Sequence, residues 1–203
     1  GDTVAAPNQA MFSLTLIGEV ASGGMVQRGG AKIGDDIFVT GTIGHGFIGL
    51  EDAKAERSSP CRDLFEYPQP PLAFALVAAS YMSAAVDVSD GLAADLGHIC
   101  KASVCGMQID LPAIPFADPV SKNLLAQLNG GDDYQLAFTA ASENHDKLKQ
   151  LAAEQSIQLS KIGHITDGSD LILLNSDGLT LDYSSTGTSQ ELPSGFSHFG
   201  MKK

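Results

Sequence analysis

A strand-to-helix junction constrains the fold of this chain more than any other stretch. Residues 84–99 read AAVDVSDGLAADLGHI, an alternating apolar run followed by apolar side chains at helical spacing. We expect Asp87 on the strand, Ser89 as the helix cap and Asp90 on the first helical turn. Two carboxylates held that close at the mouth of a junction favour a bound cation.

The rest of the chain alternates between strand and helix patterns without strict βαβ regularity. This mixture predicts the α/β (α+β) class, an open mixed β-sheet with helices packed on its faces. The expected strands are 12–20, one within 34–44, 106–110, 133–140, and three in the stretch 157–184. The expected helices are 45–57, 72–82, one starting at Ser89, 119–128 and 142–155.

Three local expectations concern loops and caps. Residues 58–72 carry four of the nine prolines, which predicts a loop. Residues 72–82 are apolar on all sides, which is typical of a buried helix. Ser142 is expected to cap the helix that follows it.

Composition excludes several classes of partner. The 203 residues carry 12 basic and 24 acidic side chains, and this net charge of −12 repels nucleic acid. No apolar run approaches the roughly 20 residues that span a bilayer, and the first residues lack the pattern of a signal peptide. The three cysteines lack metal-type spacing and are expected to be free thiols. We therefore expect a cytoplasmic protein that binds neither membrane nor nucleic acid.

The junction itself carries opposing electrostatic tendencies. A strand end aimed at a helix N-terminus presents free N–H groups and favours an anion such as phosphate. Asp87 and Asp90 add negative charge at the same place. A divalent cation between the carboxylates and phosphate oxygens reconciles the two, as Mg²⁺ does in nucleotide sites. The alternative is that Ser89 and Asp90 only cap a helix while Asp87 is in a salt bridge.

Other candidate residues, taken alone, are weaker evidence for a binding site. Asp2 follows a glycine, a pair that taken alone is ordinary turn chemistry, and Asp132 and Asp133 could be solvated turn acids. Paired acids of this kind raise each other's proton affinity unless a cation or a hydrogen-bond donor is near. Arg28 lies between glycines and a strand, where its guanidinium could bind phosphate or simply face solvent. The histidines show no ligand spacing, and no P-loop or nucleophile elbow occurs.

Five segments together resemble the thiamine-monophosphate kinase family, in the same order and at similar separations over nearly the whole chain. They are GGAKIGDDIFVTGTIG, AAVDVSDGLAADLGHI, NGGDDYQLAFT, KIGHIT and GFSHF. The Asp-x-Ser-Asp-Gly-Leu junction followed by Asp-Leu-Gly-His is characteristic of that family. Its superfamily also includes aminoimidazole ribonucleotide synthetase, selenophosphate synthetase and a hydrogenase maturation factor, all of which bind ATP.

The resemblance implies a fold, a reaction and partners. Residues 1–20 would be the last strand of a missing N-terminal domain, and residues 21–203 the C-terminal α/β ATP-binding domain of the aminoimidazole ribonucleotide synthetase-like fold. The reaction would transfer the γ-phosphoryl group of ATP, the co-substrate, to thiamine monophosphate with several Mg²⁺ ions. The full-length protein would be a homodimer, and this chain alone would be inactive.

The resemblance also assigns residues, although none is singled out as catalytic. ATP would contact Gly1, Asp2, Arg28 and Ser89. Metal ions would be held by Asp2, Asp87 and Asp90. The thiamine substrate would contact Asp132 and Phe196.

The chain departs from the family pattern at these positions and elsewhere. Asp132 stands where a glutamate is usual, and Phe196 where a tyrosine or tryptophan is usual. The proline element YPQPP lacks the two arginines that normally flank it. Two alternatives therefore remain: another ATP-using enzyme of the superfamily, or a folded domain without catalytic competence.

Overall fold

The computed structural model describes residues 15–20, 24–177 and 180–183. Within these ranges the strands are β1 (Asp36–Thr40), β2 (Ala84–Asp87), β3 (Gly106–Asp110), β4 (Leu136–Ala140), β5 (Leu159–Thr166), β6 (Leu171–Leu174) and β7 (Thr180–Tyr183). The α-helices are α1 (His45–Lys54), α2 (Pro60–Glu66), α3 (Leu72–Ala78), α4 (Leu92–Ser103), α5 (Leu124–Asn129) and α6 (His145–Glu154).

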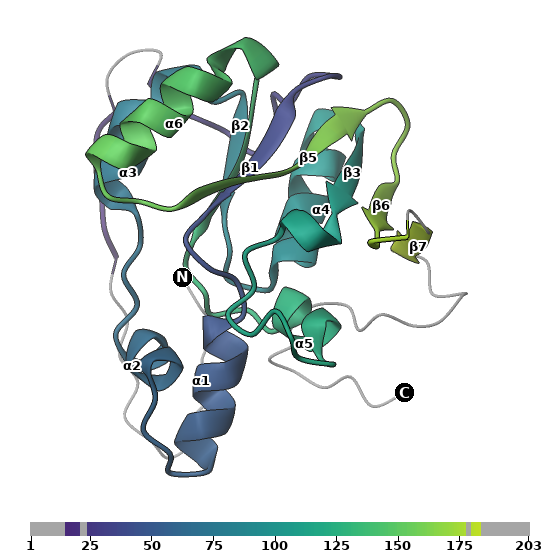
Figure 1. Ribbon diagram of the computed structural model, residues 1–203. Helices are drawn as coiled ribbons and strands as arrows, with labels where there is room; N and C mark the ends of the chain where they lie inside the picture. Colours follow the sequence, from purple (N-terminus) through teal and green to yellow (C-terminus); the bar gives the residue numbers. More distant parts are fainter. Residues whose placement is uncertain (1–14, 21–23, 178–179, 184–203) are drawn as a thin grey trace.

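The strands form one mixed sheet, as the sequence predicts. Its order in the described residues is β2-β4-β1-β5-β3-β6-β7 (Figure 1). Neighbouring strands are antiparallel except for β3 and β6, which run parallel. Strands far apart in the sequence are therefore neighbours: β2 pairs with β4, and β1 lies between β4 and β5.

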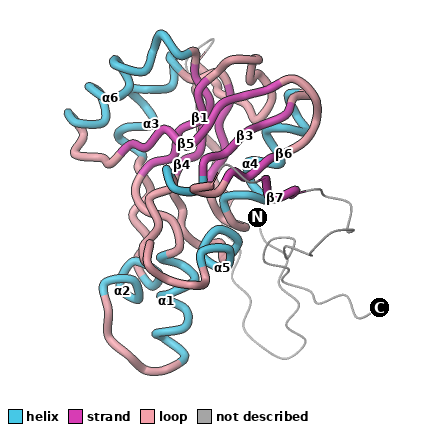
Figure 2. Tube along the Cα trace, turned by 45° about the vertical axis from the view of Figure 1, so that its right-hand side comes forward, coloured by secondary structure: helices cyan, strands magenta, loops and turns pink. Residues whose placement is uncertain are grey.

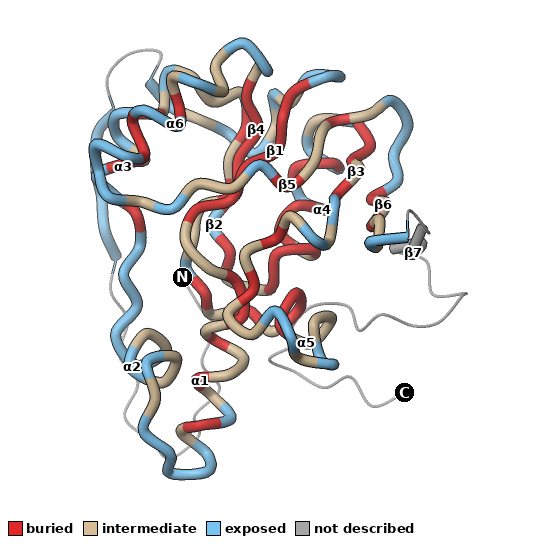
Figure 3. The backbone as a smooth tube through the Cα atoms, in the orientation of Figure 1, coloured by how far each residue is buried: buried red, intermediate tan, exposed pale blue. Residues whose placement is uncertain are grey.

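Helices cover both faces of the sheet, so the protein has two hydrophobic cores. On one face, Leu92 and Leu96 of α4 belong to the same buried cluster as Ile37 of β1. On the other face, Phe38 of β1 packs with Phe74 of α3 and with side chains of α6. Every residue of β1 is buried, because successive strand side chains point to opposite faces and both faces are covered (Figure 3).

Helices α1 and α2 form a hairpin that extends away from the sheet (Figures 1 and 2). The prediction of a loop over residues 58–72 is wrong in its first half, where α2 lies. The Ser59 side chain accepts a hydrogen bond from the Arg62 backbone N–H, and Pro60 occupies the first helical turn. Proline at that position is compatible with a helix because its missing N–H would have no partner there.

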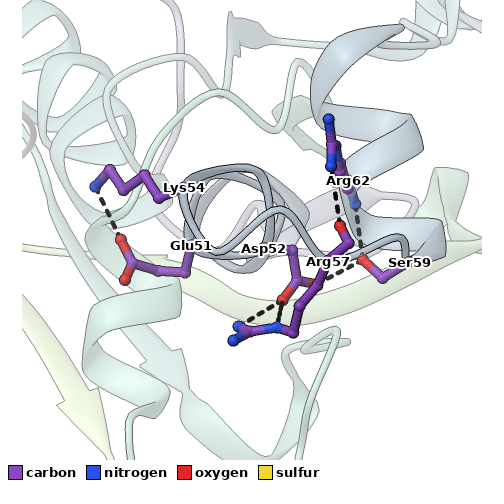
Figure 4. Close-up of polar contacts among 6 residues, drawn as sticks. All are labelled: Glu51, Asp52, Lys54, Arg57, Ser59 and Arg62. Atoms are coloured by element: carbon purple, nitrogen blue, oxygen red, sulfur yellow. Dashed lines mark hydrogen bonds and ion pairs between the residues drawn. The ribbon is translucent and has the colours of Figure 1, made fainter.

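Asp52 fixes the connection between the two hairpin helices (Figure 4). Its carboxylate accepts hydrogen bonds from Arg57 Nε at 2.9 Å and from Ser59 Oγ at 2.5 Å. The guanidinium of Arg62 donates to the Arg57 carbonyl oxygen at 3.2 Å. These contacts give the tip of the hairpin a defined conformation although it is largely exposed.

Three further local predictions are wrong or only partly tested. Helix α3 ends at Ala78 and is not buried all round, since Leu76 is 82% exposed. Ser142 does not cap α6; its hydroxyl donates to the Gly34 carbonyl oxygen instead. Of the strand expected at 12–20, residues 15–20 are exposed and outside the sheet, and the others lie outside the described residues.

The remaining strand predictions and the existence of the other helices are confirmed, with boundaries shifted by a few residues. Within the described part of the chain, every helix is too short or too polar to traverse a lipid bilayer.

Candidate functional site

The predicted site residues gather where β2 and β4 end. The two strands pair up to Asp87 and Leu136, and backbone hydrogen bonds continue this pairing beyond them. Val88 N–H donates to the Gln135 carbonyl oxygen at 2.8 Å, and Asp132 N–H donates to the Ser89 carbonyl oxygen at 2.9 Å. The structure thus brings Asp132 beside Ser89, although 43 residues of sequence separate them.

The turn that carries Asp132 has an unusual backbone. Gly131, Asp132 and Tyr134 have φ angles of +68°, +56° and +49°, in the left-handed region. A Cβ on Gly131 would lie 2.5 Å from the Ser89 carbonyl oxygen, so only glycine fits there. The Tyr134 hydroxyl donates to the Asp132 carboxylate at 3.0 Å. Asp132 is half-buried and faces the loop of residues 88–91 through its backbone.

Asp133, the second acid of the pair, points inward and holds the start of α1. Its two carboxylate oxygens accept the backbone N–H groups of Gly44 at 2.8 Å and Gly46 at 2.9 Å. Burial raises the pKa of Asp133 to about 6, although these N–H donors, with that of His45, oppose the rise. Asp133 is therefore not a solvated turn acid; it fixes the turn that presents Asp132.

The loop between β2 and α4 differs from the predicted helix start. Helix α4 begins at Leu92 after Gly91, and no side chain caps it at that residue. Ser89 is therefore not the cap, and Asp90 precedes the first helical turn. The Ser89 and Asp90 backbone N–H groups instead donate to Asp95 Oδ2, at 2.9 and 3.1 Å. The alternative that Ser89 and Asp90 serve only as caps is thus wrong.

The side chains of Asp87 and Asp90 are left without basic partners. Asp87 is exposed and Asp90 half-buried. Within the described ranges, neither side chain has an ion pair or a hydrogen bond. The salt bridge considered for Asp87 is therefore absent from the described residues. Carboxylate oxygens without a basic partner are ligands that suit a hard cation such as Mg²⁺.

Arg28 and Asp87 line one pocket of about 400 Å³ at the outer edge of β2. Arg28 is positioned by its neighbour Gln27, whose carbonyl oxygen accepts the Ala85 N–H at 3.0 Å. The rest of the wall is mainly apolar: Val26, Ala75, Ala79, Met82, Ala85, Val86 and Leu136. The pocket thus combines one cation and one anion with apolar walls.

The structure brings together Asp87, Ser89, Asp90 and Asp132 at the end of β2. Arg28 lines the same pocket as Asp87. Gly1, Asp2 and Phe196 lie outside the described residues, so their expected roles stay predictions.

Sequence reasoning missed two residues that shape the site, Asp95 and Asp133. For Asp133 the signal was the paired acids before a strand, which need a nearby donor. For Asp95 it was an acid in the first turn of the helix after a glycine.

The fold and this loop place the chain in a known class of protein. The family described as AIR synthase related protein, C-terminal domain, matches residues 32–174, and the chain belongs to it. Among curated relatives, the chain is similar to thiamine-monophosphate kinases. That of Escherichia coli (strain K12) is 35% identical over 200 residues, covering 90% of this chain and 60% of the relative. That of Bacillus subtilis (strain 168) is 33% identical over 180 residues, covering 82% and 55%.

Solved structures give the same relationship. The thiamine-monophosphate kinase from Stenotrophomonas maltophilia K279a superimposes with a TM-score of 0.70 and 33% identity, covering 80% of this chain and 56% of that one. AaThiL complexed with AMPPCP and TMP gives 0.68 and 26%, covering 86% and 54%. Hydrogenase maturation protein HypE in complex with ATP shares the fold alone, at 14% identity and a TM-score of 0.64. The chain thus spans little more than half the length of the relatives it matches.

Proposed function

We propose that this chain is the C-terminal, nucleotide-binding part of an enzyme that transfers the γ-phosphoryl group of ATP to thiamine monophosphate. The observation that carries the proposal is the convergence of Asp87, Ser89, Asp90 and Asp132 at the end of β2, from two segments distant in sequence. The similarity to thiamine-monophosphate kinases, one of them complexed with AMPPCP and TMP, supports the choice of substrates.

Asp87 and Asp90 would hold Mg²⁺, with Asp2 as a further ligand. Their side chains have no basic partner in the described part of the chain, and the whole chain has a net charge of −12. When bound, Mg²⁺ would neutralise phosphate oxygens that the carboxylates alone would repel. The neutralised arrangement favours binding of the triphosphate at this edge of the sheet.

ATP would lie across the end of β2. The Arg28 guanidinium, which lines the same pocket as Asp87, would donate to phosphate oxygens, and Ser89 would contact the nucleotide from the adjoining loop. Gly1 and Asp2 would complete the nucleotide contacts. Asp132 and Phe196 would contact the thiamine substrate.

The reaction requires little covalent chemistry from the protein. A phosphate oxygen of thiamine monophosphate attacks the γ-phosphorus, the bond from that phosphorus to the β,γ-bridging oxygen breaks, and ADP leaves with the electron pair. The attacking phosphate is largely ionised at neutral pH because its second pKa is near 6. No general base is therefore needed, and the residues named above contribute positioning and charge.

The wider organisation is proposed on the same basis. Residues 1–20 would be the last strand of an N-terminal domain and residues 21–203 the ATP-binding domain, in a cytoplasmic homodimer. The lengths of the relatives support only the further domain, since the chain covers 60% of the Escherichia coli kinase.

The test is a product assay on the protein that contains this chain together with its flanking sequence. Purified protein is incubated with ATP, Mg²⁺ and thiamine monophosphate, and thiamine diphosphate is measured by chromatography after oxidation to a fluorescent thiochrome. We expect product that depends on both ATP and Mg²⁺. ATP hydrolysis without thiamine diphosphate would assign the protein to another ATP-using branch of its superfamily.

A further inference from the structure

Asp95 is a buried charged residue that the proposed function leaves without a role. It lies on the first turn of α4, next to the loop that carries Ser89 and Asp90, and only 2% of its surface is exposed. Burying a carboxylate is costly unless its oxygens receive hydrogen bonds. Its position therefore calls for a compensating interaction, and two backbone groups provide it.

Those two groups belong to consecutive residues of the loop. Asp95 Oδ2 accepts the Ser89 N–H at 2.9 Å and the Asp90 N–H at 3.1 Å. Fixing two successive amides restricts the peptide plane between them, and so fixes where the side chains of Ser89 and Asp90 start. Gly91, which follows, has a φ of +112°, and a Cβ there would lie 2.8 Å from the Asn129 backbone. The loop therefore has one tightly specified path.

The opposite side of the loop is also held. The Ser89 carbonyl oxygen accepts the Asp132 N–H at 2.9 Å, and the Val88 carbonyl oxygen accepts the Tyr134 N–H at 2.8 Å. Those contacts bind carbonyl groups, whereas Asp95 binds the N–H groups. Asp95 thus accepts hydrogen bonds from N–H groups of the loop that the 132–134 turn does not bind.

Asp95 also adds charge beside Asp90. Ligand atoms of Asp90, Asp95 and His98 all lie within 4.8 Å of one another. Burial raises the pKa of Asp95, and the nearby charges of Asp90 and Asp87 add to the rise, against the two amide donors. The carboxylates therefore repel each other, so the loop needs a rigid backbone to keep Asp90 close to its neighbours.

We propose that Asp95 is a positioning residue for phosphoryl transfer, which holds the Ser89 and Asp90 backbone so that the Asp90 side chain is presented to the metal ion. The inference rests on the proposed function for the identity of the metal and nucleotide. Asp95 itself need not contact either ligand. Replacing groups that orient metal ligands reduces metal affinity or activity by about 10–100-fold.

The test compares three variants of the full-length protein. Asp95→Ala removes both acceptor contacts, whereas Asp95→Asn keeps an amide oxygen that can accept both N–H groups. Asp52→Asn is the matched control, because Asp52 is also a buried, hydrogen-bonded carboxylate but lies in the α1–α2 hairpin. For each variant the Mg²⁺ concentration at half-maximal activity, kcat, the KM for ATP and Tm are measured.

We expect Asp95→Ala to raise the Mg²⁺ concentration at half-maximal activity by about 10–100-fold. We expect Asp95→Asn to stay within about threefold of wild type, since its oxygen can rescue the hydrogen bonds. Asp52→Asn should lower Tm without moving the Mg²⁺ midpoint. A lower Tm with unchanged Mg²⁺ dependence in Asp95→Ala would overturn the proposal. A tenfold loss of activity or of Mg²⁺ affinity in Asp95→Asn would also overturn the proposal. This second variant tests the proposal even where Asp95→Ala does not fold.

A second readout separates this inference from the proposed function. Binding of a non-hydrolysable ATP analogue is measured against Mg²⁺ concentration in the same proteins. If the wild type makes no thiamine diphosphate, the proposed substrate is wrong, but the binding midpoint still reports on Asp95. A shift of that midpoint in Asp95→Ala, but not in Asp52→Asn, supports the positioning role, and equal midpoints contradict it.

Discussion

Asp132 and Ser89 are joined by a hydrogen bond of 2.9 Å from the Asp132 backbone N–H to the Ser89 carbonyl oxygen. Together with the hydrogen bond from the Tyr134 N–H to the Val88 carbonyl oxygen, this contact connects the two acidic segments of the chain, one after β2 and the other before β4. It also means that the position of Asp132 depends on the path of the 88–91 loop. Changes to either segment should therefore affect the proposed nucleotide, metal and substrate contacts together.

Asp87→Asn should lower kcat by about 10²-fold or more, because it removes a charge from the proposed metal site. The Asp87 side chain is exposed and unpaired in the described residues, so Tm should stay about unchanged. Steady-state kinetics and thermal unfolding of the full-length protein check both statements. Normal kinetics with a large loss of stability would show that Asp87 is structural.

Arg28→Lys should raise the KM for ATP by about tenfold while leaving the KM for thiamine monophosphate near wild type. Lysine keeps the charge but loses the forked pair of donors, and hydrogen bonds to charged groups contribute about 1.5–3 kcal/mol. Arg62→Lys is the control, since Arg62 is in α2 and pairs with Glu66. An equal KM for ATP in the two variants would show that Arg28 does not contact the nucleotide.

Asp133 should make stability depend on pH. Burial raises its pKa to about 6, from an ordinary value of 3.8, so the folded protein binds this proton more tightly than the unfolded chain. Its contribution to stability is then fully present below about pH 4 and is lost as the pH rises through about 6, by about 3 kcal/mol.

The measurement is urea unfolding of wild type and Asp133→Asn between pH 4 and pH 8. The asparagine variant does not titrate there, so the difference in free energy of unfolding between the two proteins should change by about that amount across the range. Parallel pH profiles would show that the Asp133 carboxyl keeps its ordinary pKa.

The sequence predicted most of the sheet because short apolar runs bounded by turn residues indicate strands, as in β1 and β2. It placed Asp87 correctly on the strand β2, whereas Asp90, expected on the first helical turn, precedes α4. It failed where an outcome depends on contacts between distant segments. The role of Asp133 is set by the amides of Gly44 and Gly46, about 90 residues earlier in the chain. The hairpin helix α2 was missed because the cap at Ser59 outweighs the proline content around it.

Gly131→Ala should damage both stability and substrate binding. Its φ of +68° is unfavourable for alanine, and the added Cβ would lie 2.5 Å from the Ser89 carbonyl oxygen. Backbone strain of this kind costs about 1–3 kcal/mol, and relief of the overlap must move the turn or the loop. Either movement displaces Asp132 relative to Ser89, so the KM for thiamine monophosphate should rise as Tm falls.

Gly168→Ala separates the two causes. Gly168 also has a positive φ, of +99°, but a Cβ there meets nothing within 4 Å. This variant should therefore show the backbone strain alone, with a smaller loss of stability than Gly131→Ala and unchanged kinetics. Because the two substitutions are chemically identical, any excess loss at residue 131 measures the close approach of the turn to the Ser89 carbonyl. Equal losses in stability and equal kinetics would mean that the 131–134 turn can move away from the 88–91 loop without consequence for the site.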